Sequence, residues 1–362
     1  MNRVTIAGLA DQLGISKASV SYALNGQPGV SETTRQKVLM LARELGWYPS
    51  SSARALSHAR ADVIGIVLSR EPEMIGSEPY YMSLLAGIES VLSAADVSLL
   101  LRMVGSAGTR DLAVYERWAG ERRVDGVILF DHLDRDPRPA LLDRLSLPFV
   151  LHGASRASAD LAGTVVDQAA DAATLVRHLH GLGHRRIAHI SGPLALVHER
   201  MRKAAVLADA AELGMAVREI ECDYTMAGAA AATRALMDPA ALGSSGSSGS
   251  AGSSGSSGSS GSADLPTALI FGNDLMAMGG AAALKELGIA IPAAVSVVSW
   301  DDSILCQVGS PAVTALQRDP EEQGRSSARL LLDVIAGRDR QSISSPPGRL
   351  VVRASTGRGP TG

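Results

Sequence analysis

The sequence predicts an α/β protein with a small all-helical head and a larger body built on parallel sheets. Residues 4–46 hold three short helical patterns separated by glycines. From residue 61 onward, apolar runs alternate with amphipathic stretches, which is typical of parallel sheets with helices on both faces. A chain of 362 residues has room for two or three domains, so two sheets with a cleft between them are favoured over one.

Charge is divided unevenly between head and body. The chain carries a formal net charge of -3 with neutral histidines. Residues 1–60 contain seven Lys and Arg against three Asp and Glu, a balance of +4, so the remaining 302 residues carry -7. A basic head on an acidic body indicates a module that binds a polyanion, attached to a part with another task.

Composition and motifs argue against several classes of protein. Two cysteines, Cys222 and Cys306, predict no disulfide framework and favour a reducing compartment. No apolar run reaches the roughly 18 residues that a membrane span needs, and the N-terminus lacks a secretory pattern. We therefore expect a cytoplasmic protein without a membrane partner. No phosphate loop or GxSxG occurs, so no enzyme activity, catalytic residue or cofactor is expected.

The three head helices have recognisable start and stop signals. Their expected N-caps are Thr5, Ser16 and Ser31, which can accept backbone N–H groups. Gly14 and Gly46 are expected to end the first and third helices. Two short helices joined at a glycine-containing turn and braced by a third form a helix-turn-helix, whose second helix enters the DNA major groove.

That geometry assigns a DNA-reading face to the second helix, residues 17–24. Lys17, Ala18 and Tyr22 are expected at base edges, while hydroxyls and helix starts hold phosphates. A plain helical bundle is the alternative, which the basic charge disfavours. The predicted DNA contacts of the head are Thr5, Ser16, Lys17, Ala18, Ser21, Tyr22, Ser31 and Thr34.

Residues 49–60 are expected to join head and body. A serine cluster precedes helix formers and one leucine, Leu56, a stretch too short to be a stable helix alone. One interpretation is a plain linker. The other is a hinge helix that orders on DNA, with Ala53 and Leu56 contacting DNA and Leu56 wedged into a minor-groove step.

The body elements follow from apolar periodicity. Expected strands are 63–69, 98–104, 124–130, 148–152, 186–191, 268–272 and 295–300. Expected helices are 80–95, 111–121, 168–182, 200–214, 226–238, 274–287 and 321–336. Residues 243–262 contain only Gly, Ser and one Ala, so they predict a flexible loop, either a natural insertion or an introduced linker.

Several stretches resemble the LacI/GalR family of bacterial transcription regulators, in that family's order. They are VTIAGLADQLGISKASVSYALNG, YPSSSARALS, GLGHRRIAHISGP, FGNDLMAMG, and IPAAVSVVSWDDS followed by PAVTALQRD. The resemblance covers the chain except the Gly/Ser segment. It implies a body like a periplasmic sugar-binding protein, with two α/β subdomains around a ligand cleft and crossings near residues 160, 290 and 320.

The resemblance also sets expected domain bounds. The head would span 1–48, the hinge 49–60 and the effector-binding and dimerisation core 61–362. Within the core, the N-subdomain is expected at about 61–160 and 291–319, and the C-subdomain at about 161–290 and 320–350. Tyr22 stands where the family often has an arginine, so the usual Arg-to-guanine contact is lacking and the operator sequence stays open.

The resemblance implies an effector site residue by residue. Arg202 matches the arginine that clamps effector hydroxyls or a carboxylate, and Asn273 and Asp301 match pocket residues. The residue types agree, because a guanidinium donates while amide and carboxylate oxygens accept, a set suited to polyols. Asp301 also follows the strand 295–300 directly, at the edge where open α/β sheets bind ligands.

Further effector contacts are expected around these three residues. Trp300 or Phe130 could stack on a sugar face, and Tyr80, His152 and Asp167, with Tyr81 and Gly153, match the pocket rim. Asp274 is interpreted as the N-cap of helix 274–287 in preference to a ligand contact. No metal site is expected, because His178 and His180 diverge on a helix that ends before His184.

These features together imply a homodimeric regulator that binds a pseudo-palindromic operator in double-stranded DNA. We expect a repressor of carbohydrate-utilisation genes, associated with the nucleoid while bound and released by a small-molecule sugar effector. The alternative is a purine- or nucleoside-responsive regulator, or one whose ligand acts as a corepressor. A transport binding protein and a sugar-modifying enzyme are rival classes, disfavoured by the basic head and by the missing catalytic motifs.

Overall fold

The computed structural model describes residues 4–47, 60–70, 78–105, 110–154, 161–238, 265–338 and 341–360. Its contacts divide the chain into two units, residues 1–62 and 63–362. The predicted hinge contacts Ala53 and Leu56 lie outside the described residues, so the hinge-helix interpretation stays a prediction. None of the described helices has the length and apolar character needed to span a bilayer.

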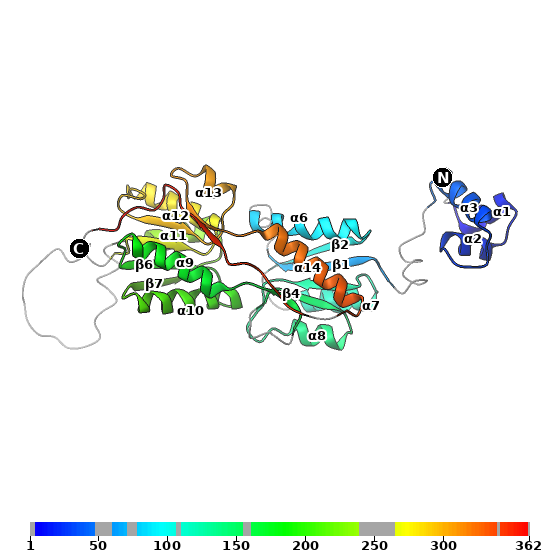
Figure 1. The fold of residues 1–362 in the computed structure, drawn as a ribbon, viewed down its shortest axis with the longest axis horizontal. Coiled ribbons are helices and arrows are strands. Elements are labelled where there is room, and N and C mark those ends of the chain that lie inside the picture. The colour runs from blue at the N-terminus through cyan, green and yellow to red at the C-terminus, as the bar shows by residue number, and fades with distance from the viewer. Residues whose placement is uncertain are drawn as a thin grey trace, which may run out of the picture. The chain divides into compact units, whose positions relative to one another are not determined.

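The first unit contains the three predicted head helices (Figure 1). They are α1 (Ile6–Leu13), α2 (Lys17–Leu24) and α3 (Glu32–Glu44). The side chains of Thr5, Ser16 and Ser31 each accept a hydrogen bond from the backbone N–H of the residue three positions later. All three predicted N-caps are therefore confirmed. Apolar side chains from all three helices close one small core, formed by Leu9, Ala10, Val20, Ala23, Val38 and Ala42.

The second unit contains two six-stranded sheets. The first runs in the order β11-β5-β4-β3-β1-β2, and every neighbouring pair is parallel. Its strands are β1 (Val63–Ser69), β2 (Ser98–Val104), β3 (Gly126–Leu129), β4 (Phe149–Ala154), β5 (Gly163–Val165) and β11 (Ile343–Ser344). The helices that belong with it are α6 (Pro79–Ala94), α7 (Arg110–Gly120), α8 (Arg138–Arg144) and α14 (Pro320–Ile335).

The second sheet runs in the order β12-β10-β9-β8-β6-β7, with only β12 antiparallel to its neighbour. Its strands are β6 (Arg186–Ser191), β7 (Ala216–Glu221), β8 (Ala268–Phe271), β9 (Ser296–Ser299), β10 (Thr314–Gln317) and β12 (Arg349–Val351). Its helices are α9 (Gln168–Gly181), α10 (Val197–Glu212), α11 (Met226–Leu236), α12 (Asp274–Glu286) and α13 (Ile304–Val308). The predicted fold class, two parallel-sheet α/β parts behind a helical head, is confirmed.

The expected division of the core was wrong in its C-terminal third. Strands β9 and β10 belong to the second sheet, whereas 291–319 was expected with the first. Helix α14 packs on α6 of the first sheet, whereas 320–350 was expected with the second (Figure 1). The chain crosses between sheets after β5, after β10 and after β11, so no crossing occurs near 290. Apolar periodicity reveals which residues are buried but not which sheet buries them.

Two glycines let α6 and α14 approach closely. A Cβ on Gly87 would lie 1.9 Å from the backbone oxygen of Glu321, and one on Gly324 would lie 2.2 Å from the backbone oxygen of Leu84. The backbones therefore touch where the last helix of the chain rests on the first helix of the sheet. This contact fixes α14, and with it the crossover that precedes it, against the first half of the body.

Candidate functional site

A cleft lies where the carboxyl ends of strands from both sheets meet. Arg70 follows β1 and Asp131 follows β3 in the first sheet, while Gly272 follows β8 and Asp301 follows β9 in the second. The cleft holds about 780 Å³ free of protein atoms, its open mouth included. The strand ends are where open α/β sheets bind ligands.

Arg202 lies on α10 at the floor of this cleft and is 6% exposed. Its Nη1 donates to Glu199 Oε1 at 2.7 Å and to the Gly272 carbonyl at 3.1 Å, and its Nε donates to Gln168 Oε1 at 3.0 Å. Burial opposes ionisation of Glu199, but the nearby Arg202 guanidinium outweighs this effect and holds the pKa of Glu199 below its usual value. Within the part of the chain that the structure describes, Arg202 Nη2 makes no hydrogen bond, so it remains available to a ligand.

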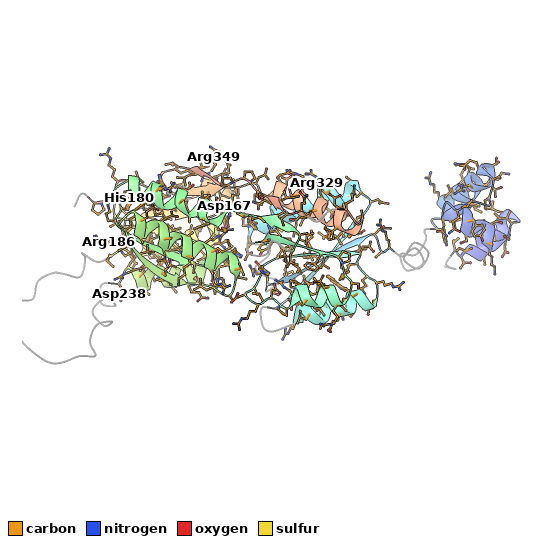
Figure 2. The ribbon with its side chains drawn as sticks, turned by 60° about the horizontal axis from the view of Figure 1, so that its bottom comes forward. Asp167, His180, Arg186, Asp238, Arg329 and Arg349 are labelled. Carbon is orange, nitrogen blue, oxygen red and sulfur yellow. The ribbon has the colours of Figure 1, made fainter. Side chains whose placement is uncertain are left out.

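Trp300 and Asp167, two predicted effector contacts, do not line the cleft. The Trp300 ring is fully buried, and the Arg202 guanidinium lies over it at 4.8 Å from the ring centroid. It therefore supports the arginine from behind instead of stacking on a ligand. Asp167 caps α9 by accepting the Ala170 N–H at 3.1 Å, and Figure 2 places it at the opposite end of that helix from His180.

The start of α12 differs from the prediction by one residue. Asn273, not Asp274, is the N-cap, and its Oδ1 accepts the Met276 N–H at 2.8 Å. The amide oxygen expected to accept from an effector is thus engaged by the helix, and the Asn273 amide nitrogen is the donor that this cleft residue has left. Asp274 is the first helical residue, is 2% exposed and lines the cleft as well.

Arg318 is a cleft residue that sequence reasoning missed. It follows β10 at a crossover, and it bonds Asp301 Oδ1 through Nη2 and Asp171 Oδ2 through Nη1 at 3.4 Å. Asp171 also accepts the Gly348 N–H at 2.7 Å, next to the last crossover. Asp301 does line the cleft as predicted, but it is held by an ion pair that links the site to two of the three crossing segments.

The three predicted residues on the first-sheet wall, Tyr80, His152 and Phe130, are brought together. The Tyr80 hydroxyl lies 3.0 Å from His152 Nε2 and donates to Gln323 Oε1 at 3.2 Å. His152 Nδ1 is 3.0 Å from the Ser327 hydroxyl, and the ring packs on Phe130 with centroids 5.1 Å apart. Burial lowers the pKa of His152 to about 4, so this wall is uncharged at neutral pH.

The cleft also holds residues that sequence reasoning missed, Arg70, Asp131, His198 and Tyr224, beside the predicted Tyr81. Arg70 Nη1 lies 3.1 Å from Asp131 Oδ2, and the Tyr81 hydroxyl donates to Asp131 Oδ1 at 2.8 Å. His198 Nε2 lies 2.8 Å from the Tyr224 hydroxyl, and burial lowers the pKa of His198 to about 4. Arg70 and Asp131 directly follow strands, which is the sequence signal that could have identified them.

The cleft is equipped to bind a polar molecule of modest size. Its walls offer guanidinium and amide donors, carboxylate acceptors and aromatic faces, the set that orients a ligand by hydrogen bonds and stacking. Among the residues described, no three His, Cys, Asp or Glu side chains are grouped as metal ligands.

The head presents the predicted face of α2. Lys17 and Ala18 are exposed, while Val20 and Ala23 on the opposite face are buried. Tyr22 is 43% exposed, and its ring lies beside Gly29, a glycine with φ of +111°. Ser21 accepts the Asn25 side-chain amide at 3.3 Å. Lys17 makes no hydrogen bond or ion pair with any described residue, so its charge is available to a partner.

The predicted phosphate-holding hydroxyls sit at helix starts. The Ser16 hydroxyl lies 2.9 Å from Ser19 Oγ at the start of α2, and the Ser31 hydroxyl lies 2.8 Å from Thr34 Oγ1 at the start of α3. Both hydroxyls stand beside the free N–H groups of a first helical turn. A helix N-terminus of this kind favours an anion through its N–H groups and dipole. Thr5 caps α1 in the same manner, with its Oγ1 3.2 Å from the Gly8 nitrogen.

Separate protein-family models match the head and the body of the chain, the two parts that the structure also shows. A family model described as bacterial regulatory proteins of the lacI family matches residues 5–50. A model for periplasmic binding proteins and the sugar-binding domain of the LacI family matches 61–240, and a periplasmic-binding-protein-like model matches 176–356.

Individual proteins match over nearly the whole chain. The HTH-type transcriptional regulator CelR of Thermobifida fusca is 29% identical, covering 94% of both chains. The crystal structure of a LacI family transcriptional regulator from Bifidobacterium animalis is 33% identical, with a TM-score of 0.69, over 82% of this chain and 98% of that one. A CelR–cellobiose complex is 27% identical, with a TM-score of 0.70, over 98% of this chain and 100% of that one.

Proposed function

We propose, from the family to which the chain belongs, a repressor of carbohydrate-utilisation genes that a sugar releases from its operator. That family is the LacI family of DNA-binding transcription regulators, which are not enzymes. The observation that carries the sugar assignment is the cleft with Arg202 at its floor and aromatic rings on its wall. A guanidinium fork and carboxylates satisfy hydroxyl groups, while Phe130 and Tyr80 offer apolar faces. The CelR–cellobiose complex supports the same class of ligand.

We propose a homodimer on a pseudo-palindromic operator. A helix-turn-helix reads one half-site, so two heads related by a two-fold axis match a palindrome. Edge strand β2 and helix α6 carry the exposed apolar side chains Leu101 and Met82, which suit a contact with a second copy. Because DNA is the partner, we propose that the regulator works in the cytoplasm, at the nucleoid while bound. Ala53 and Leu56 remain proposed hinge contacts with the minor groove.

Effector binding and operator binding would be coupled reciprocally. Asp301 lines the cleft and bonds Arg318, and Arg318 bonds Asp171, which also holds the Gly348 backbone. A ligand that bonds Asp301 would therefore act on two crossing segments between the subdomains. We propose that the resulting change in the N-subdomain disfavours the paired hinges and releases DNA.

A thermal-shift screen tests the effector class. Purified protein is heated with neutral sugars, sugar phosphates, purines and nucleosides, and each hit is added to the operator complex. A ligand at 100 times its Kd stabilises by about 2.7 kcal/mol, a readily measured shift. A sugar hit that releases DNA supports the proposal. A hit only among purines or nucleosides, or a hit that strengthens DNA binding, would favour the nucleoside-responsive or corepressor alternative.

Lys17→Ala should weaken operator binding about tenfold, because a side chain at a base edge contributes about 1–3 kcal/mol. The operator is first selected from random DNA with the wild-type protein, and affinity is then measured by fluorescence anisotropy at several salt concentrations. Lys285→Ala removes the same charge from the exposed end of α12 in the body and should leave affinity unchanged. Unchanged affinity and sequence preference in Lys17→Ala would remove this lysine from the DNA interface.

A further inference from the structure

Two buried carboxyl groups line the cleft from opposite subdomains, and each has one oxygen that accepts no hydrogen bond from a described residue. Glu78 precedes α6 of the first sheet and is 6% exposed, and Asp274 begins α12 of the second and is 2% exposed. Glu78 Oε1 and Asp274 Oδ2 have no hydrogen-bond partner among the residues that the structure describes, and both residues line the cleft. Buried polar atoms are nearly always partnered, so two orphan acceptors at one cavity indicate a ligand that supplies the donors.

Glu78 makes no hydrogen bond with a described residue that would explain its position. It stands at the N-cap position of α6, but its side chain caps nothing. Its Oε1 lies 3.8 Å from Arg70 Nε, beyond hydrogen-bonding distance, and that nitrogen is itself buried without a partner. Arg70 is committed to Asp131 through Nη1 at 3.1 Å. The glutamate therefore does not cap the helix, and its ion pair with Arg70 is too long to include a hydrogen bond.

The cleft has more carboxylates than cations to match them. Arg202 is engaged by Glu199, Arg318 by Asp301 and Asp171, and Arg70 by Asp131. The two histidines of the cleft are uncharged at neutral pH, because burial lowers the pKa of His152 and of His198 to about 4. Arg70 lies nearer to Asp131 than to Glu78, so among the described residues Glu78 and Asp274 are the cleft carboxyls that no arginine reaches at hydrogen-bonding distance.

Burial and neighbouring carboxylates disfavour ionisation of both groups. Burial raises the pKa of Glu78 to about 7, against the pull of Arg70 and with the help of Asp131, Asp274 and Asp301. Burial and Asp301 likewise raise the pKa of Asp274 to about 6. A cation between them would relieve both the desolvation and the mutual repulsion. A hydroxyl would satisfy one oxygen but would leave the repulsion, and a phosphate would add to it.

We propose that Glu78 and Asp274 together hold a protonated amino group of the effector, so that the regulator responds to an amino sugar. The inference rests on the proposed sugar-responsive function and narrows its ligand. Arg202 would bind hydroxyls at the floor of the cleft, and the Tyr80–His152–Phe130 wall would pack against the ring. The amino group would bridge the two subdomains, one carboxylate from each, and so favour the closed cleft.

Matched sugar pairs test this assignment on the full-length protein. Binding of D-glucosamine and D-glucose, D-galactosamine and D-galactose, and the β-1,4-linked glucosamine disaccharide and cellobiose is measured by calorimetry at pH 7. The members of each pair differ in amino against hydroxyl groups. In the pair that fits, we expect the amino sugar to bind about tenfold or more tightly than its hydroxyl partner, because a hydrogen bond between two charged groups is roughly twice as strong as a neutral one.

Two isosteric variants and a change of pH test whether Glu78 and Asp274 cause the preference for the amino sugar. Asp274→Asn and Glu78→Gln should each reduce the amino preference to below about threefold while the hydroxyl sugar still binds, whereas Glu212→Gln, exposed on α10, should keep it.

From pH 7 to 5.5 the preference for the amino sugar should fall, because both carboxyls take up protons. The groups facing them are Arg70, Tyr81, Asp131, Asp301, Ser303 and Cys306, of which Tyr81 and Cys306 stay uncharged throughout because burial raises the pKa of each.

The outcomes separate this inference from the function on which it rests. A hydroxyl sugar that binds as tightly as its amino partner, or an amino preference that survives both isosteric variants, overturns the subsite and leaves the sugar-responsive regulator in place. If no sugar of either kind binds, or if only purines or nucleosides bind, both the subsite and the sugar assignment fail.

Discussion

Replacing Arg202 with alanine should abolish effector-driven release from the operator while operator affinity is retained. The guanidinium is the donor group at the floor of the cleft, and a hydrogen bond from a charged group contributes about 1.5–3 kcal/mol, so affinity for a sugar should fall at least tenfold and toward a hundredfold. The α2 face that we propose reads DNA belongs to a separate unit and should be unaffected. Calorimetry with the effector, and anisotropy with the operator, measure the two properties.

Arg202→Ala should also lower stability, since it leaves Glu199 buried and unpaired. Breaking a buried pair in this way costs about 3–5 kcal/mol. Arg202→Lys keeps a cation beside Glu199 but loses the planar fork, so it should fold better and still respond poorly. Arg234→Ala breaks the exposed pair with Glu286 and should change stability by less than about 1 kcal/mol. An Arg202→Lys or Arg202→Ala protein that is released normally would exclude Arg202 from the site.

Gly87→Ala should destabilise the body by about 2–3 kcal/mol. The new Cβ would meet the backbone oxygen of Glu321 at 1.9 Å, and a backbone atom cannot move aside as a flexible side chain can. The cost of overpacking exceeds the roughly 1 kcal/mol that alanine gains over glycine in helix propensity. Urea unfolding followed by circular dichroism should show a lower midpoint.

The matched control is Gly120→Ala at the end of α7. A Cβ there has no atom within 4 Å, so the substitution should be neutral or stabilise by up to about 1 kcal/mol. Equal unfolding midpoints for Gly87→Ala and the wild type would mean that α6 and α14 do not touch through their backbones as described.

The head could be predicted from sequence because its signals are local. Thr5, Ser16 and Ser31 each stand directly before an amphipathic helix, and each caps it. Strands β1 and β8 could be predicted as well, because central parallel strands are continuous apolar runs. The short strands β10 to β12 lack such runs and depend on partners distant in the chain, so periodicity did not reveal them.

The family resemblance indicated Arg202, Asn273 and Asp301, whereas residue type and strand position alone indicated less of the site. Asp301 also follows a buried strand, and the same reasoning applied to Arg70 and Asp131 would have identified them. Trp300 also follows a strand, but whether a ring at that position faces a ligand or the core depends on side-chain direction, which the sequence does not encode. Asn273 and Asp274 are equally good helix caps, and packing decided between them.

The three crossings between the sheets have a consequence for synthesis on the ribosome. The first sheet begins at residue 63, yet its covering helix α14 ends at Ile335 and its edge strand β11 at Ser344. The half of the body that starts first therefore cannot be completed until nearly the whole chain has been made. During that interval the face that α14 will cover is exposed to water, and such a surface invites aggregation. Neither half can be obtained as one continuous fragment, so dissecting the regulator by truncation would remove parts of both.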